Sequence, residues 1–371
     1  MSAFISGSSS SFSSISSSIS ISTMIVSIVV IVIIVIIIIT ISLLKSNKPK
    51  KYNHVLISGG SSGIGYSLAL SLVRQGSRVT LLARNVSKLK EAQGLLQEEY
   101  VKIFGDKSTN VVMIASVDVS ESEEAVIRAL VPSIKAFGIV DLLINCAGTS
   151  IAGSFDALPT EEFERMLRIN VLGSIYPTRA VLPGMKSTGK GNIVFVASQV
   201  AQVAIHGYTA YGASKWALRG LAEALQMEVK PYGIYVSVAY PPDTDTPGYA
   251  VEMETKPSLT KKLSESGNLF KPDAVASDIL NQISSQYFGI TTGLDGWLLK
   301  QLHPGMSPIN NIWELVQQIM FCSIARIIAM FYIIGWDMEC KKAKELEQSS
   351  SSSSSSPTVS KTRVTRSRKT K

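Results

Sequence analysis

The chain has 371 residues, and a hydrophobic content of 46% is enough for a sizeable buried core in one large domain or two small ones. Much of its formal net charge of +8 lies in two stretches, 45–51 and 360–371, that are not interleaved with aromatic residues, so we expect a solvated tail or attraction to a membrane surface and no nucleic-acid binding. The three cysteines, Cys146, Cys322 and Cys340, lack metal-ligand spacing, which argues against a metal site and a disulfide framework and indicates a reducing compartment.

The first predicted elements precede Lys45, the first charged residue. Residues 1–22 are rich in serine, and we expect them to be disordered. The apolar run 23–44 is long enough to cross a bilayer as a helix, in which the backbone satisfies its own hydrogen bonds. A cleaved signal peptide is the alternative, but the run is overlong and a basic segment before it is missing. The lysines at 45–51 then predict that the remainder of the chain lies in the cytosol.

From residue 52 to about residue 300, short apolar runs alternate with longer amphipathic stretches. The apolar runs predict buried parallel strands at 54–59, 78–83, 111–117, 140–145, 192–197 and 235–240. The stretches between them predict helices near 64–75, 85–103, 120–136, 160–186 and 209–230. Strict alternation of this kind predicts an α/β fold, a doubly wound parallel sheet (Rossmann-like) in a single domain over 52–300.

The segment 312–336 is apolar again but contains Arg326. A charge at the centre of a spanning helix costs about 2.5–3.5 kcal/mol on insertion scales, and a second crossing would place the basic tail in the lumen. We therefore expect a membrane-associated or re-entrant helix, with a second span, a core helix or an oligomer contact as alternatives. Residues 345–371 are expected to form a disordered tail, whose last four residues loosely resemble a retrieval signal for the endoplasmic reticulum.

A glycine-rich turn follows the first predicted strand and precedes a helix. Its glycines leave room for a tight turn and for close approach of the backbone to a phosphate, while the helix N-terminus offers unpaired N–H groups and a favourable dipole. The expected cofactor contacts are Gly59, Ser61, Ser62, Gly63, Ile64 and Gly65. The spacing of the three glycines, with the motifs that follow, resembles the short-chain dehydrogenase/reductase family.

The end of the second strand distinguishes between the two nicotinamide cofactors. NAD sites place a carboxylate there to bind the ribose 2′-hydroxyl, whereas this chain has Arg84 followed by Lys88 one helical turn later. Two cations and no acid fit the 2′-phosphate of NADPH. The alternative is a solvated start of a helix.

Two further strand ends resemble family motifs. Asp118, after the third strand, resembles the aspartate beside the adenine, although a helix cap would give the same sequence. The stretch Asn145-Cys146-Ala147-Gly148 resembles the family's Asn-Asn-Ala-Gly turn. We expect Asn145 to lie at the cofactor site and Cys146 to be a packing residue.

Tyr211 and Lys215 lie four residues apart on an expected helix, so their side chains share one face. Hydride delivery to a ketone builds negative charge on its oxygen, and a proton must be supplied there. A phenol with a pKa of about 10 is a poor match for neutral pH, and we expect the Lys215 ammonium to lower that pKa. The resemblance adds Ser198, which would donate to the carbonyl oxygen, and Asn170, which would hold a water. It also implies that Tyr211 and Lys215 contact the cofactor.

The stretch after the sixth strand, 239–252, has Pro241-Pro242-Asp243 where most of the wider family has Pro-Gly. With the motifs above, it resembles the branch that reduces 3-oxosphinganine, a long-chain sphingoid ketone, to sphinganine with NADPH on the cytosolic face of the endoplasmic reticulum. Membrane lipid is then an expected partner, because an anchor and an interfacial helix would hold the pocket mouth at the lipid surface. Asp243 or Asp245 would either pair with the substrate ammonium or cap a turn.

Two other functions share parts of this pattern. One is a membrane-bound reductase of steroid or retinoid carbonyls. The other is a non-catalytic membrane tether with a nucleotide fold as its scaffold, which the intact set of Ser198, Tyr211 and Lys215 disfavours. Tyr208 belongs either to the substrate pocket or to packing. Helices 160–186 and 209–230 often form dimer faces in the wider family, so the resemblance is compatible with a homo-oligomer.

Overall fold

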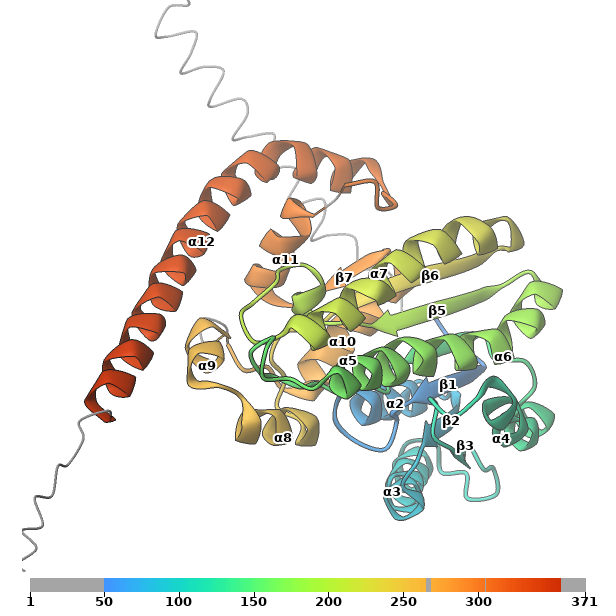
Figure 1. Cartoon of the computed structure of the whole chain (residues 1–371). Coiled ribbons are helices and arrows are strands. Elements are labelled where there is room, and N and C mark those ends of the chain that lie inside the picture. Colours follow the sequence, from blue (N-terminus) through green and yellow to red (C-terminus); the bar gives the residue numbers. More distant parts are fainter. Residues whose placement is uncertain (1–49, 265–267, 304, 355–371) are drawn as a thin grey trace, which may run out of the picture. The chain divides into compact units, whose positions relative to one another are not determined.

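A parallel sheet of seven strands lies at the centre of the computed structural model, which describes residues 50–264, 268–303 and 305–354 (Figure 1). The order of the strands is β3-β2-β1-β4-β5-β6-β7. Their bounds are β1 His54–Ser58, β2 Arg78–Ala83, β3 Val112–Ser116, β4 Leu142–Asn145, β5 Gly191–Val196, β6 Ile234–Tyr240 and β7 Gly289–Thr291. The chain moves outward from β1 to β3 and returns to β4 beside β1, so the strand order reverses there, where α/β proteins bind ligands.

Helices cover both faces of this sheet, as the alternating pattern predicts. One core contains Leu68 and Leu72 of α2 with Ile279 of α10, and the other contains Leu130 of α4 and Leu218 of α7. These and the other helices are α2 Gly63–Arg74, α3 Val86–Phe104, α4 Glu123–Phe137, α5 Thr160–Met166, α6 Gly173–Thr188, α7 Thr209–Val229, α8 Pro247–Thr255, α9 Ser258–Ser264, α10 Pro272–Ser284, α11 Gly293–Leu302 and α12 Ile312–Ser354.

Strand β1 shows why these strands are almost continuously apolar. Val55 and Ile57 belong to one core, while Leu56 between them belongs to the other. Successive side chains of a strand point to opposite faces, so a sheet covered on both faces buries all of them. The predicted doubly wound sheet is confirmed.

The predicted anchor 23–44 and the serine-rich segment 1–22 lie outside the described residues, as does the predicted tail beyond residue 354. The first ten residues of that predicted tail, 345–354, instead continue α12. Lysine and glutamate, which favour helices, are frequent just before them.

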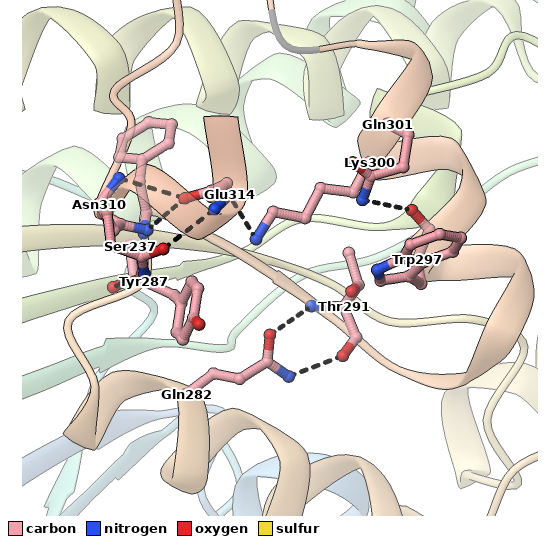
Figure 2. Close-up of polar contacts among 11 residues, drawn as sticks. Ser237, Gln282, Tyr287, Thr291, Trp297, Lys300, Gln301, Asn310 and Glu314 are labelled. Carbon is pink, nitrogen blue, oxygen red and sulfur yellow. Dashed lines mark hydrogen bonds and ion pairs between the residues drawn. The ribbon is translucent and has the colours of Figure 1, made fainter. Parts of the chain in front are cut away.

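A polar network around the buried Glu314 holds the start of α12 at the edge of the sheet (Figure 2). Lys300 Nζ of α11 lies 2.8 Å from Glu314 Oε1 of α12 and 4.6 Å from the ring centroid of Tyr287. Asn310 donates from its backbone N and from Nδ2 to Glu314 Oε2, both at 3.1 Å, and accepts from the backbone N–H of Phe288 beside β7. This junction therefore ties α11 and α12 to one end of the sheet.

Beyond this junction α12 is apolar and mostly exposed. Among the described residues, α12 is the helix that is long and apolar enough to cross a membrane. Its apolar part has a mean hydropathy of 1.9, and only 6% of an 18-residue apolar stretch within it is buried. It is therefore not a core helix, which removes one of the alternatives for 312–336. Arg326 is the charged residue that interrupts the apolar run, and it is one of the residues that line a cavity.

Candidate active site

A cavity of about 1260 Å³ lies at the carboxyl ends of the central strands. The glycine-rich turn after β1 lines one part of it, and the ends of β5 and β6 line the middle. At the opposite part, Leu298 and Leu302 of α11 and Ile328, Tyr332 and Ile333 of α12 contribute apolar surface. The cavity is thus polar where the strands end and mostly apolar along the C-terminal helices, where Asp295 and Arg326 are the charged residues of the lining.

The glycine-rich turn has a geometry that larger residues would disrupt. Gly59 has a φ of +69°, and a Cβ there would lie 2.9 Å from the backbone of Ala147. A Cβ on Gly65 would lie 2.3 Å from the carbonyl oxygen of Gly59. Ser62, which precedes α2, makes no capping hydrogen bond with its side chain, and the first turn of α2 has no acidic residue. The turn therefore presents backbone N–H groups to the cavity and fits a dinucleotide diphosphate.

Arg84, Lys88 and Asp118 all line the same cavity. Arg84 Nη1 lies 3.6 Å from Asp118 Oδ2, and the Arg84 side chain is 73% exposed. Burial opposes ionisation of Asp118, but hydrogen bonds from Ser120 and the charge of Arg84 lower its pKa. Arg84 and Lys88 thus offer two cations at the end of β2, one of them partly shared with Asp118.

Asn145 occupies a different place from the rest of the predicted cofactor set. Its side chain is buried, its Nδ2 donates to Thr178 Oγ1 at 3.0 Å, and it is absent from the cavity lining, where Cys146 and Ala147 take its place. The short strand β4 ends at Asn145, so the turn that faces the cavity begins one residue later. Asn145 therefore joins the central strand β4 to α6 through Thr178 and does not face the cavity.

Ser198, Tyr211 and Lys215 converge on the middle of the cavity. Ser198 follows β5 and begins a short 3₁₀ turn, accepting from the backbone N–H of Val200 at 3.2 Å. Tyr211 and Lys215 lie in the first two turns of α7. Lys215 Nζ donates to the carbonyl oxygen of Val196 at 3.0 Å and lies 5.8 Å from the Tyr211 ring centroid. The sequence prediction that these three side chains share one site agrees with this placement.

Protonation in this group differs from the expectation. Burial raises the pKa of Tyr211, Glu252 and Asp243 raise it further, and a hydrogen bond with Ser198 opposes them. Burial lowers the pKa of Lys215 to about 8, partly offset by Cys146. The expected lowering of the Tyr211 pKa by Lys215 is therefore wrong for the chain by itself, because burial of the phenolate outweighs its favourable contacts. A raised pKa favours the neutral phenol, which is the form of Tyr211 that can donate a proton.

Asn170 lies in a π-helical turn, Leu167–Leu172, between α5 and α6. Its Nδ2 donates to the Thr149 carbonyl at 3.0 Å and to Ser214 Oγ at 2.8 Å, and its Oδ1 accepts from the backbone N–H of Thr149 at 2.9 Å. A Cβ on Gly148 would lie 3.0 Å from Asn170 Oδ1 and 3.4 Å from Lys215 Nζ. Asn170 is thus close to Lys215, while its predicted contact with a water stays a prediction.

A second polar group lies beside Tyr211, and the sequence motifs do not include most of it. Tyr208, whose ring centroid is 5.6 Å from that of Tyr211, donates from its hydroxyl to Glu252 of α8. Lys256 Nζ is fully buried and lies 3.5 Å from Glu252 Oε1 and 3.9 Å from Asp243 Oδ2. We call Tyr208, Asp243, Glu252 and Lys256 the Glu252 cluster. The four-residue spacing of Glu252 and Lys256 could have indicated an ion pair, but the same spacing is typical of ion pairs on solvated helix surfaces.

The two aspartates considered for an ammonium contact lie in different surroundings. Asp243 lines the cavity, whereas Asp245 is exposed and outside it. Gln202, which no motif indicated, also lines the cavity, and its buried Oε1 has no hydrogen-bond partner among the described residues. The cavity beside Tyr211 is therefore lined by the acidic residues Asp243 and Glu252 as well as by the predicted set.

Comparisons with known proteins agree with this architecture. The family described as short chain dehydrogenase matches residues 53–256. The chain is 46% identical to the 3-ketodihydrosphingosine reductase of Bos taurus over 284 residues, covering 76% of this chain and 84% of that protein. It is 46% identical to the 3-dehydrosphinganine reductase of Danio rerio over 299 residues, covering 80% and 89%. Among solved structures, an alcohol dehydrogenase from the archaeon Thermococcus sibiricus complexed with 5-hydroxy-NADP is 27% identical, with a TM-score of 0.55 over 65% of this chain and 95% of that one.

Proposed function

The chain belongs to the short-chain dehydrogenase/reductase family, and from this membership we propose that it reduces 3-oxosphinganine to sphinganine with NADPH. The observation that carries the proposal is the continuity of one cavity. Its lining runs from the glycine-rich turn, past Ser198, Tyr211 and Lys215, to the apolar side chains of α11 and α12. A nucleotide, a reacting carbonyl and a long hydrocarbon chain each find surface of matching chemistry along it.

The preference for NADPH over NADH is part of this proposal. The family fold is one that binds nicotinamide dinucleotides, and the cradle around Gly59 and Gly65 would hold the diphosphate. Arg84 and Lys88 would bind the 2′-phosphate, because a cation there satisfies a phosphate and a carboxylate would repel it. Asp118 would lie beside the adenine. Lys215, near the end of β5, would contact the nicotinamide ribose.

Bound NADPH supplies a hydride to the carbonyl carbon of the substrate. Tyr211 is the proton donor, since its raised pKa keeps the phenol neutral until an alkoxide begins to form on the substrate oxygen. Ser198 donates a second hydrogen bond to that oxygen and stabilises its developing charge. Lys215 supplies a positive charge close to the phenolate that remains, and Asn170 holds the Thr149 backbone beside it.

We also propose a location, the endoplasmic reticulum membrane, with the domain 52–300 in the cytosol. The apolar exposed part of α12 supports membrane association. Arg326 lines the cavity, and its charge would be costly at the centre of a spanning helix. The segment 312–336 would therefore lie in the lipid surface and not span the membrane. A substrate that stays in the leaflet would then reach the apolar end of the cavity without crossing water.

The test uses the full-length protein in detergent with NADPH and a panel of 3-oxosphinganine, retinal and an 11-oxosteroid. We expect oxidation of NADPH with the first ketone and sphinganine as the product identified by mass. Turnover of a steroid or retinal without turnover of 3-oxosphinganine would refute the proposal. Protease protection in sealed microsomes tests the orientation: the catalytic domain should be cleaved from outside.

A further inference from the structure

The Glu252 cluster has no role in the chemistry described above, although it lies against the reacting phenol. Asp243, Glu252 and Tyr208 line the cavity, whereas Lys256 does not. Lys256 is 4% exposed and sits behind the two carboxylates, 3.5 Å from Glu252 and 3.9 Å from Asp243. The cavity is therefore bounded by carboxylate oxygens, and the cation that balances them is turned away from it.

The charges in this cluster do not balance. One ammonium faces two carboxylates, so one negative charge within the cluster stays uncompensated when both acids are ionised. An uncompensated charge that is largely removed from water is costly, and the Glu252 side chain is only 12% exposed. At Asp243, burial raises the pKa and Glu252 raises it too, while the charge of Lys256 and a hydrogen bond with Tyr249 lower it. A cationic group in the cavity would remove this cost.

The position of the cluster relative to Tyr211 fits a substituent next to the reacting carbonyl. The Tyr208 ring packs 5.6 Å from the Tyr211 ring, and the Tyr208 hydroxyl donates to Glu252 and fixes that carboxylate. Both Glu252 and Asp243 act electrostatically on the Tyr211 phenol. A cation between them and Tyr211 would weaken that effect and make the phenol a better proton donor.

We propose that Glu252 and Asp243 form a subsite for the protonated amino group of an α-amino ketone, held adjacent to the carbonyl that Tyr211 protonates. The inference rests on the proposed function and names the feature of the substrate that the enzyme selects.

The test compares two substrates, 3-oxosphinganine and the same hydroxy ketone without its amino group, using the full-length protein with NADPH. We expect the wild type to prefer the amino ketone in kcat/KM by about tenfold or more, as for a charge-assisted hydrogen bond. Glu252→Gln keeps the size of the side chain and an acceptor for Tyr208. It should lower kcat/KM for the amino ketone about 10- to 100-fold and leave the other ketone unchanged, so the preference disappears.

The chain offers matched controls for both carboxylates. Glu254→Gln changes an exposed acid on the same helix, and Asp245→Asn changes an exposed acid two residues from Asp243; both lie outside the cavity. Neither should alter the preference. Asp243→Asn should reduce it less than Glu252→Gln, because the Asp243 side chain is 37% exposed. NADPH binding to each variant is measured by fluorescence. If Glu252→Gln does not bind NADPH, Asp243→Asn alone tests the proposal.

The outcomes separate the subsite from the proposed function. A wild type that reduces both ketones with equal kcat/KM keeps its function and refutes the subsite. An equal loss on both ketones in Glu252→Gln also refutes it, since a merely structural role would lower both. A wild type that reduces neither ketone refutes the proposed function and the subsite with it.

Discussion

Arg84 provides the most direct test of cofactor selection, through the substitution Arg84→Ala. A charge-assisted hydrogen bond contributes about 1.5–3 kcal/mol. The lower part of that range applies, because the Arg84 side chain is 73% exposed and lies 3.6 Å from Asp118, which competes for its charge. A loss of about 1.5–2 kcal/mol corresponds to a fall in kcat/KM for NADPH of roughly 10- to 30-fold, at about 1.4 kcal/mol per factor of ten.

The assay measures initial rates with saturating ketone and varied NADPH or NADH. Arg84→Ala should lower kcat/KM for NADPH by this factor and leave that for NADH unchanged, since NADH has no phosphate for the arginine to bind. Lys90→Ala removes an exposed cation of α3, the helix that follows Arg84, and this lysine lies outside the cavity. It should change kcat/KM for neither cofactor. An unchanged ratio of the two cofactors in Arg84→Ala would refute the assignment of Arg84 to the 2′-phosphate.

Three further predictions concern the reacting group and the C-terminal junction. Tyr211→Phe should lower kcat about 10²- to 10⁴-fold with an unchanged Kd for NADPH, and stopped-flow rates near wild type would contradict its role as proton donor. Burial lowers the pKa of Lys215 to about 8, so its ammonium is populated below that pH and lost above it, and kcat/KM for NADPH should fall as the pH rises through about 8. In Lys215→Arg the guanidinium stays charged, so the fall should move to higher pH. A fall that stays at the same pH in Lys215→Arg would contradict this role. Glu314→Gln leaves the half-buried Lys300 ammonium without its anion and should lower the free energy of unfolding by about 3 kcal/mol. Denaturant titration should also show that adding Lys300→Met to Glu314→Gln recovers part of the loss, and additive losses would argue against the pair.

Local sequence was sufficient for six of the seven strands and for the placement of Ser198, Tyr211 and Lys215 in one cavity. Residues 55–57 and 193–197 are apolar without interruption, and burial on both faces of a sheet is the physical cause. The Tyr211–Lys215 spacing needed only a helix to bring both side chains to one face. Strand β7 was not predicted, because it has three residues, begins with Gly289 and is recognisable only beside β6.

The parts that the sequence did not predict depend on contacts between distant segments. Glu252 and Lys256 become a buried pair only because α8 folds back against Tyr208. The pKa of Tyr211 depends on its burial, which the four-residue spacing to Lys215 does not reveal. Asn145 lies outside the cavity lining because β4 extends to this residue and the turn that lines the cavity begins at Cys146; hydrophobicity alone does not fix such a boundary to one residue.

The π-helical turn at Leu167–Leu172 has a consequence for how this chain tolerates changes in length. A turn of this kind holds one more residue than an α-helical turn, and each residue of an α-helix advances the side chain by about 100°. Deleting one residue here would restore regular winding and rotate α5 relative to α6, whose buried side chains include Thr178 and Met185. The Asn170 amide would then lose its hydrogen bond to Ser214 of α7. A deletion in this short stretch should therefore harm the enzyme more than most substitutions there.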